Sequence, residues 1–268
     1  MKAPFKHIVT GYEKALFLGS FIDAATVAHT SNAEIAVCFA DLRGFTKFVD
    51  ALQTKSQDTR VHSFLRAYFG IYPKAILEMI YGLEPTESKT ITAQRERVCS
   101  TLVPSMYKHL GDGMMLVWEL TGDRATDDEV SGRILQTIKI VQRRFDKFIQ
   151  AQVRSAVTPY RTAVGNLKLG FGLARGRAWR LDFGSRGPRD YAGNIVNLAA
   201  RLQDLARPEG IVAEAGFCDP LFRKLSQRLN EVEVKGMDDK IEVWTSPEVV
   251  VTGLPNMSTT VQRAKFRA

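Results

Sequence analysis

Short apolar runs alternate along most of the chain with longer stretches in which apolar residues recur every three or four positions. Apolar runs of roughly four to eight residues between turn residues are typical of strands, and the three-to-four spacing is typical of helices. Strands are predicted over residues 35–40, 101–110, 113–120, 167–173, 178–183, 210–213, 232–235 and 241–245. Helices are predicted over 44–53, 58–81, 127–153, 193–205 and 219–225. The pattern predicts an α+β fold, a mixed sheet with helices packed on it.

The order of these elements contains the βαββαβ arrangement of a ferredoxin-like core. Three stretches interrupt it. Residues 1–33 mix apolar and polar positions and are predicted as an N-terminal helical extension, with one helix over 12–28. Residues 82–100 are polar and charge-mixed, which predicts a loop insertion. The main domain is therefore expected over 34–246, followed by a C-terminal tail over 247–268.

No apolar run approaches the roughly 20 residues that a helix needs to cross a bilayer. The N-terminus lacks the apolar core of a secretory signal. The three cysteines, Cys38, Cys99 and Cys218, are far apart and show no metal-binding spacing. These features predict a cytoplasmic protein without a membrane partner.

The chain has a formal net charge of +8, with 45% hydrophobic residues. Such a charge suits either nucleic acid or a small polyanion such as a nucleoside triphosphate. The basic residues are spread along the chain, and no basic stripe is interleaved with aromatic residues. The charge pattern therefore argues against a nucleic-acid partner and leaves a triphosphate substrate open.

An aspartate ends the first predicted strand. The apolar run 35–40 leads into Asp41, and Gly44 and Thr46 follow closely. A buried strand of this kind delivers a carboxylate to the sheet edge, and the backbone amides after it are free to face an anion. The layout fits a metal ion held against phosphates. Taken alone, Asp41 fits a turn former or a helix cap as well.

A second aspartate lies in the hairpin Gly111-Asp112-Gly113, between the second and third predicted strands. In a βαββαβ sheet the first strand lies beside the third, so the end of the first strand and this hairpin meet at one edge. Asp41 and Asp112 would then form a carboxylate pair for one or two hard divalent ions. Taken alone, the sequence around Asp112 is also that of a plain hairpin turn.

Two polar residues share a face of the helix predicted over 193–205. Asn197 and Arg201 are four positions apart, which places them on one side of a helix. An amide and a guanidinium together suit a ribose oxygen and a phosphate oxygen. By themselves they also fit an ordinary solvated helix face.

Together these motifs resemble the catalytic domain of the class III nucleotide cyclases, the adenylate and guanylate cyclases. The resemblance rests on Phe39-Ala40-Asp41-Leu42-Arg43-Gly44-Phe45-Thr46, on Lys108-His109-Leu110-Gly111-Asp112-Gly113 and on the segment from Asp190 to Arg201. The segment from Gly170 to Gly176 is similar to the family's glycine-rich strand. The resemblance covers about residues 34–246.

The resemblance implies a phosphorus-oxygen lyase that converts a nucleoside triphosphate to a 3′,5′-cyclic nucleotide and pyrophosphate. It implies two divalent ions, Mn²⁺ or Mg²⁺, held by Asp41, Asp112 and the carbonyl of Leu42. It also implies a homodimer with composite active sites. One subunit would supply the metal-binding residues, and the other would supply Asn197, Arg201 and the base-reading residues.

The same resemblance assigns the remaining binding roles. The backbone amides around Gly44, Phe45 and Thr46 would bind the phosphates, and Lys235 matches the family's phosphate-binding lysine less closely. Asn197 would orient the ribose. Arg201 would stabilise the charge that develops on the α-phosphate.

Lys108 and Asp190 fall on the family's base-reading positions. A lysine donor and an aspartate acceptor suit the N1 and amino group of adenine, and they suit O4 and N3–H of uracil equally well. Tyr191 could supply bulk or a stacking face for the smaller pyrimidine, or could be a core aromatic.

The run Arg189-Asp190-Tyr191-Ala192-Gly193 resembles the bacterial pyrimidine cyclases of the Pycsar antiphage systems. This resemblance favours conversion of UTP to cyclic UMP as an antiviral defence signal, with an adenylate cyclase as the alternative. The alternative of another class is a non-catalytic nucleotide-binding domain. Such a domain should have lost a metal-binding aspartate or the Asn197 and Arg201 pair, and none of these is lost.

Overall fold

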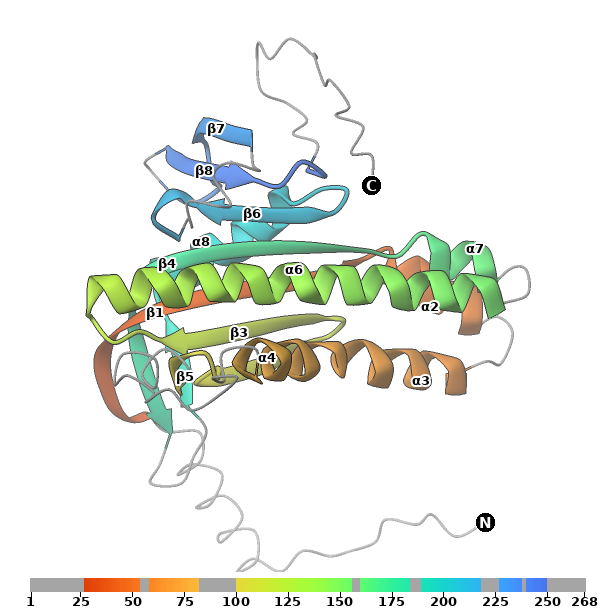
Figure 1. The fold of residues 1–268 in the computed structure, drawn as a ribbon, viewed down its shortest axis with the longest axis horizontal. Coiled ribbons are helices and arrows are strands. Elements are labelled where there is room, and N and C mark those ends of the chain that lie inside the picture. The colour runs from red at the N-terminus through yellow and green to blue at the C-terminus, as the bar shows by residue number, and fades with distance from the viewer. Residues whose placement is uncertain are drawn as a thin grey trace, which may run out of the picture.

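An eight-stranded mixed sheet runs through the computed structural model (Figure 1). The structure describes residues 27–53, 58–81, 100–155, 160–183, 189–217, 227–237 and 240–249. The strands are β1 (Val27–Arg43), β2 (Met106–Leu110), β3 (Gly113–Glu119), β4 (Lys168–Phe183), β5 (Arg189–Ala192), β6 (Gly210–Glu214), β7 (Gln227–Val232) and β8 (Ile241–Thr245). They lie in the order β2-β3-β1-β4-β6-β8-β7, and β5 pairs with β4.

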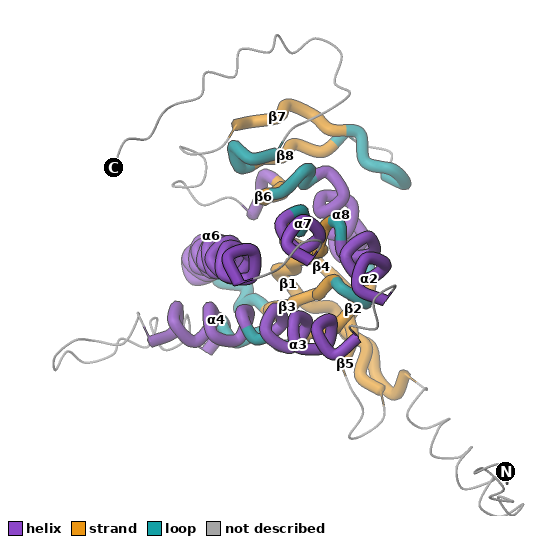
Figure 2. The backbone as a smooth tube through the Cα atoms, turned by 90° about the vertical axis from the view of Figure 1, so that its right-hand side faces the viewer, coloured by secondary structure: helices purple, strands orange, loops and turns teal. Residues whose placement is uncertain are grey.

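The helices cover both faces of this sheet (Figure 2). They are α2 (Phe45–Gln53), α3 (Asp58–Phe69), α4 (Ile71–Tyr81), α6 (Arg124–Ser155), α7 (Tyr160–Gly165) and α8 (Asn194–Leu205). Alternate residues of β1 face two separate cores, as a strand's period of two requires. Ala36 and Cys38 pack with buried residues of α3, α4 and α6. Ile35 and Val37 pack with buried residues of α8.

The predicted α+β class is confirmed, and so is the predicted pairing of the first strand with the third. β1 pairs antiparallel with β3 up to Ala40 and Met114, and with β4 along almost its whole length. The hairpin between β2 and β3 therefore lies against the end of β1, where the sequence motifs require it.

The central strands are longer than predicted. Residues 27–33 are strand, although they were assigned to a helical extension, and they continue β1 against the outer half of β4. β4 also runs unbroken where two strands were predicted. The pattern missed residues 27–33 because β4 satisfies their backbone hydrogen bonds, while their described side chains are exposed or half-buried and show no apolar alternation. Residues 1–26, including most of the helix predicted over 12–28, lie outside the described residues.

Other boundaries also differ from the prediction. The long helix predicted over 58–81 is divided at Gly70 into α3 and α4. β2 begins at Met106 rather than at 101, and β7 ends at Val232 rather than beginning there. The chain remains part of the sheet region to Val249, which is 7% exposed and bridges to Pro208. Residues 82–99 of the insertion predicted over 82–100, the helix predicted over 219–225 and residues 250–268 lie outside the described residues.

Glycines in β4 allow α8 to lie directly on the strand. A Cβ at Gly172 would overlap backbone atoms of Ala199 and Gln203, and a Cβ at Gly170 would lie 2.7 Å from the carbonyl oxygen of Ala206. No larger residue fits this contact without moving the helix. The glycine-rich strand thus fixes the height of α8, the helix of Asn197 and Arg201, above the sheet.

None of the helices in the described ranges is long and apolar enough to span a membrane.

Candidate active site

Asp41 and Asp112 meet at one edge of the sheet. Asp41 lies in β1 one residue beyond the last β1–β3 pair, Ala40 with Met114. A Cβ at Gly113 would lie 2.8 Å from the carbonyl oxygen of Ala40, so the hairpin can approach the end of β1 only with glycine there. Burial raises the pKa of the Asp112 carboxyl, and the negative charge of Asp41 raises it further. The two carboxylates are therefore electrostatic neighbours.

This pair has the chemistry of a hard-cation site. Both carboxylates are partly buried, and the negative charge of Asp41 disfavours the ionised form of Asp112, a repulsion that a bound dication relieves. A leucine side chain has no oxygen, and that of Leu42 is buried, so Leu42 could add only its backbone carbonyl as a further oxygen ligand. Within the described ranges no three His, Cys, Asp or Glu side chains form a metal-binding group. The residues present fit Mg²⁺ or Mn²⁺, which keep water and substrate oxygens as their other ligands.

A helix N-terminus follows directly after this pair. Gly44 has φ +83°, a conformation that favours glycine, and turns the chain from β1 into α2. Its carbonyl accepts a hydrogen bond from the amide of Phe48 (3.0 Å), so the helix is formed at once. Gly44 and Thr46 are exposed and Phe45 is half-buried. The first amides of α2 therefore face solvent beside the carboxylates, where an anion is favoured.

One charged residue at this edge was not singled out from the sequence. The Arg43 guanidinium donates from Nη1 to Oδ2 of Asp41 at 2.8 Å. Residues two apart on a strand share a face, so the spacing of Asp41 and Arg43 in the sequence could have indicated their contact.

Asn197 and Arg201 lie on the exposed face of α8, as predicted from their spacing. The Arg201 side chain is 49% exposed, and its Nη1 lies 3.9 Å from Oδ2 of Asp204. Across the described part of the chain, no hydrogen bond or ion pair joins either residue to Asp41 or Asp112. Within one chain, the Asn197–Arg201 pair is therefore not bonded directly to the carboxylate pair.

Lys108 and Asp190 come together although 82 residues separate them. Lys108 is in the edge strand β2 and Asp190 in β5, and Nζ lies 2.8 Å from Oδ2. They share a cleft of about 560 Å³, whose other lining residues are Pro104, Ser105, Met106, Tyr107, Phe183 and Arg189. A cationic donor and an anionic acceptor thus stand side by side in an open cleft.

Tyr191 does not line this cleft, contrary to its expected base-binding role. Successive residues of a strand point to opposite faces, so Asp190 faces the cleft and Tyr191 faces the core. Tyr191 is 4% exposed, packs beside the α8 face of the sheet and donates a hydrogen bond to Oε1 of Glu119 (2.7 Å). Burial and the neighbouring Glu119 raise the pKa of its hydroxyl. In this chain Tyr191 is a core aromatic.

Lys235 is exposed in the turn between β7 and β8. Among the described residues it forms no hydrogen bond or ion pair with Asp41, Asp112 or the start of α2. The structure therefore does not join it to the phosphate-facing amides.

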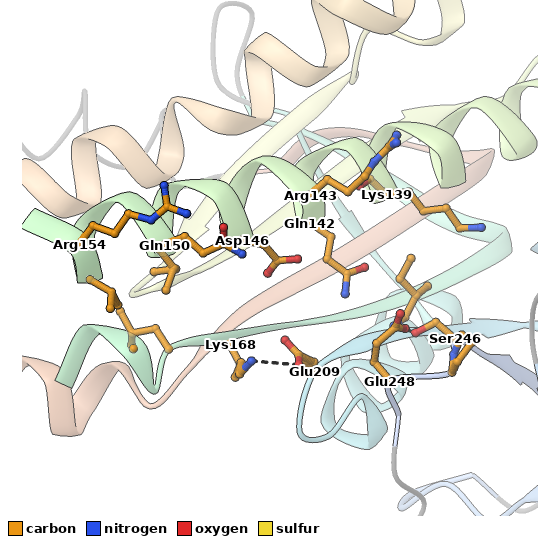
Figure 3. Close-up of a pocket in the computed structure, with 16 residues that line it drawn as sticks. Lys139, Gln142, Arg143, Asp146, Gln150, Arg154, Lys168, Glu209, Ser246 and Glu248 are labelled. Atoms are coloured by element: carbon orange, nitrogen blue, oxygen red, sulfur yellow. Dashed lines mark hydrogen bonds and ion pairs between the residues drawn. The ribbon is translucent and has the colours of Figure 1, made fainter. Parts of the chain in front are cut away.

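A larger cavity, of about 970 Å³, lies between α6 and the beginning of the neighbouring strands β4 and β6 (Figure 3). Its lining mixes both charges, with Lys168 and Glu209 forming an ion pair at 3.0 Å. Burial and the carboxylate of Glu209 raise the pKa of Asp146, which points into the cavity. None of the residues singled out from the sequence lines it, so cavity size does not locate the candidate site.

No protein-family model matches the chain. A curated adenylate cyclase of Anabaena cylindrica is 25% identical over 234 residues, which cover 83% of this chain and 38% of the relative. The chain therefore spans well under half the length of that relative.

Solved structures resemble the fold more completely. The adenylyl cyclase CyaB from P. aeruginosa is 18% identical, with a TM-score of 0.53 over 84% of this chain and 97% of that one. An adenylate/guanylate cyclase/hydrolase from Silicibacter pomeroyi is 17% identical, with a TM-score of 0.51 over 81% of this chain and 98% of that one. The chain has the fold of these cyclase domains.

Proposed function

We propose that this chain, which has a cyclase-domain fold, is a nucleotide cyclase that converts a nucleoside triphosphate to a 3′,5′-cyclic nucleotide and pyrophosphate. The observation that most supports this proposal is the meeting of Asp41 and Asp112 beside the first amides of α2. Paired carboxylates next to a helix N-terminus suit a metal-bound triphosphate. A domain that only binds nucleotide has no need to keep both carboxylates together with Asn197 and Arg201.

In this proposal Asp41, Asp112 and the carbonyl of Leu42 hold divalent ions. When bound, such ions neutralise the triphosphate and lower the pKa of the ribose 3′-hydroxyl. The amides of α2 at Phe45 and Thr46 bind phosphate oxygens and fix the triphosphate in place. The 3′-oxygen would attack the α-phosphorus while its proton passes to solvent water. The bond from the α-phosphorus to the pyrophosphate oxygen breaks as the new bond forms.

The active site is proposed to be shared between two copies of the chain. Asn197 and Arg201 are exposed on α8 and form no hydrogen bond or ion pair with the carboxylate pair of their own chain. In a two-fold dimer, these residues of one copy would face Asp41 and Asp112 of the other. Asn197 then orients the ribose, and the Arg201 guanidinium stabilises the charge that develops on the α-phosphate. Each dimer has two such sites.

The base is proposed to bind in the cleft of Lys108 and Asp190. For uracil, the Lys108 ammonium donates to O4 and the Asp190 carboxylate accepts from N3–H. UTP is the favoured substrate because the run from Arg189 to Gly193 resembles pyrimidine cyclases, and cyclic UMP would then serve as an antiphage signal. ATP is the alternative, since adenine N1 and its amino group suit the same pair. Because Tyr191 lies in the core, the selection between uracil and adenine depends on Lys108, Asp190 and the other residues that line the cleft.

The test is incubation of the full chain with each of the four nucleoside triphosphates and Mn²⁺ or Mg²⁺, with the products identified by mass. Cyclic UMP is expected as the main product, together with equimolar pyrophosphate. Cyclic AMP as the only product would contradict the choice of UTP and leave the cyclase proposal standing. Nucleotide binding without any cyclic product, from folded dimeric protein, would favour a non-catalytic binding domain.

A further inference from the structure

The side chain of Arg43 connects the carboxylate Asp41 to helix α8. Its Nη1 lies 2.8 Å from Oδ2 of Asp41. Its Nη2 donates to the backbone carbonyl oxygen of Gln203 at 2.5 Å. The side-chain amide of Gln203 lies against the same group, and in the orientation that satisfies both residues its oxygen accepts from Nη1 and Nη2 at 3.2 and 2.6 Å. One guanidinium thus binds two elements that are 160 residues apart in sequence.

The surroundings of Arg43 hold this connection in place. The side chain is only 14% exposed, compared with 32% for that of Asp41. Gly170 lies opposite Asp41 in the β1–β4 register, and a Cβ there would lie 3.2 Å from Nε and Nη2 of Arg43. The absence of a side chain at Gly170 therefore leaves the space in which the guanidinium lies.

Arg43 contacts α8 at the C-terminal end of the helix, where backbone carbonyls need hydrogen-bond donors. Gln203 lies in the last turn of α8, and its carbonyl also accepts the amide of Ala206 (3.1 Å). The last carbonyls of a helix lack partners within the helix, and a cation close to them is favoured. Arg43 therefore fixes the C-terminal end of the helix that has Asn197 and Arg201 on its exposed face.

We propose that Arg43 is a positioning residue that ties Asp41 to α8 through Oδ2 and opposes a divalent ion at the same carboxylate, an inference that rests on the proposed function. The guanidinium already bonds this oxygen, so its positive charge opposes a dication at the same carboxylate. In the proposed dimer, Asp41 and the Asn197–Arg201 face of one chain serve different active sites. Arg43 then links Asp41, which acts in one active site, to the helix whose Asn197 and Arg201 act in the other.

The test replaces Arg43 by methionine, which keeps an unbranched apolar stem and removes the charge and the donors. Mn²⁺ binding to the full chain is measured without nucleotide from the free-ion electron paramagnetic resonance signal. Binding is expected to tighten about threefold to tenfold, because the opposing charge is lost. At saturating nucleotide and Mn²⁺, kcat is expected to fall about tenfold or more, because α8 loses its anchor and the reacting groups are misplaced.

Arg43→Lys tests the planar geometry of the guanidinium separately from its positive charge. Lysine keeps the positive charge but lacks the planar fork that bonds a carboxylate and a carbonyl together. The Mn²⁺ affinity of Arg43→Lys is expected to stay within about twofold of the unsubstituted chain, while kcat falls about fivefold or more. If Arg43→Met does not fold, the proposal is tested by Arg43→Lys alone. An undiminished kcat in Arg43→Lys overturns the proposal.

Arg177→Met is the matched control. Arg177 forms an ion pair of the same length, 2.8 Å to Glu34, but its side chain is 85% exposed. Neither Mn²⁺ affinity nor kcat should change in this variant. Unchanged or weaker Mn²⁺ binding in Arg43→Met, which a merely structural role would produce, overturns the proposal. If Asp41→Asn leaves Mn²⁺ binding unaltered, the metal site itself is wrong, and the role of Arg43 fails with it.

Discussion

Asp112→Asn is expected to lower cyclic nucleotide production about a thousandfold or more, an effect comparable with the loss of a principal transition-state contact. Asparagine has nearly the same shape as aspartate but no negative charge, so the variant removes half of the proposed metal-binding pair. Asp41→Asn is expected to have the same effect. Turnover is measured as cyclic product per dimer at saturating metal and nucleotide.

The same substitution should not destabilise the fold. Burial and the charge of Asp41 raise the folded-state pKa of Asp112, so the folded chain binds this proton more tightly than the unfolded chain does. Above that pKa the ionised carboxylate therefore costs stability, and a neutral residue removes the cost. The melting temperature of Asp112→Asn is expected to be equal or higher at neutral pH.

Asp128→Asn controls for a general effect of removing an acidic residue. Asp128 lies on α6, is 57% exposed and forms an ion pair with Arg175 at 2.6 Å. Its partner Arg175 pairs with Ala36, five residues along β1 from Asp41, so Asp128 lies away from the carboxylate pair and activity should persist. Full turnover in Asp112→Asn, with the protein folded and dimeric, would refute the metal-binding assignment.

Arg201→Ala is expected to lower kcat about a hundredfold to a thousandfold, the range seen when one donor to a developing negative charge is removed. The melting temperature should hardly change. The side chain is 49% exposed, and its contact with Asp204 is a 3.9 Å surface pair of little energetic value.

Asp204→Ala is the matched variant for Arg201. It removes the same surface pair and leaves the guanidinium in place, so kcat should stay near that of the unsubstituted chain. A loss of kcat in Asp204→Ala as large as in Arg201→Ala would assign the effect to the ion pair and contradict the catalytic role. Arg201→Lys is expected to retain little of the kcat, because the point charge of lysine cannot reproduce the planar fork of the guanidinium.

The sequence was sufficient to predict the meeting of Asp41 and Asp112, because two local signals combine there. A buried strand that ends in a carboxylate and a glycine-flanked hairpin are both visible in the residues themselves. The ferredoxin-like strand order then brings them to one edge, and the pairing of Ala40 with Met114 confirms that order. The shared face of Asn197 and Arg201 followed in the same way from helical spacing.

Other features depend on contacts between distant segments and were beyond a pattern analysis. Residues 27–33 are strand because β4 pairs with them, not because their own side chains alternate. Tyr191 is buried because its face of β5 is the covered one. A strand of four residues is too short for its hydrophobic pattern to predict which face is covered. The contact from Arg43 to the carbonyl of Gln203 spans 160 residues and involves a backbone atom, which no side-chain motif can reveal.

The central claim is that the carboxylates of one chain act with the Asn197 and Arg201 of another. It is tested by mixing Asp112→Asn chains with Arg201→Ala chains under conditions in which dimers exchange, with mixed dimers verified by native mass spectrometry. Each mixed dimer keeps one intact composite site, so a 1:1 mixture is predicted to recover about a quarter of the unsubstituted activity. Activity that stays at the sum of the two separate variants, with mixed dimers present, would contradict the account.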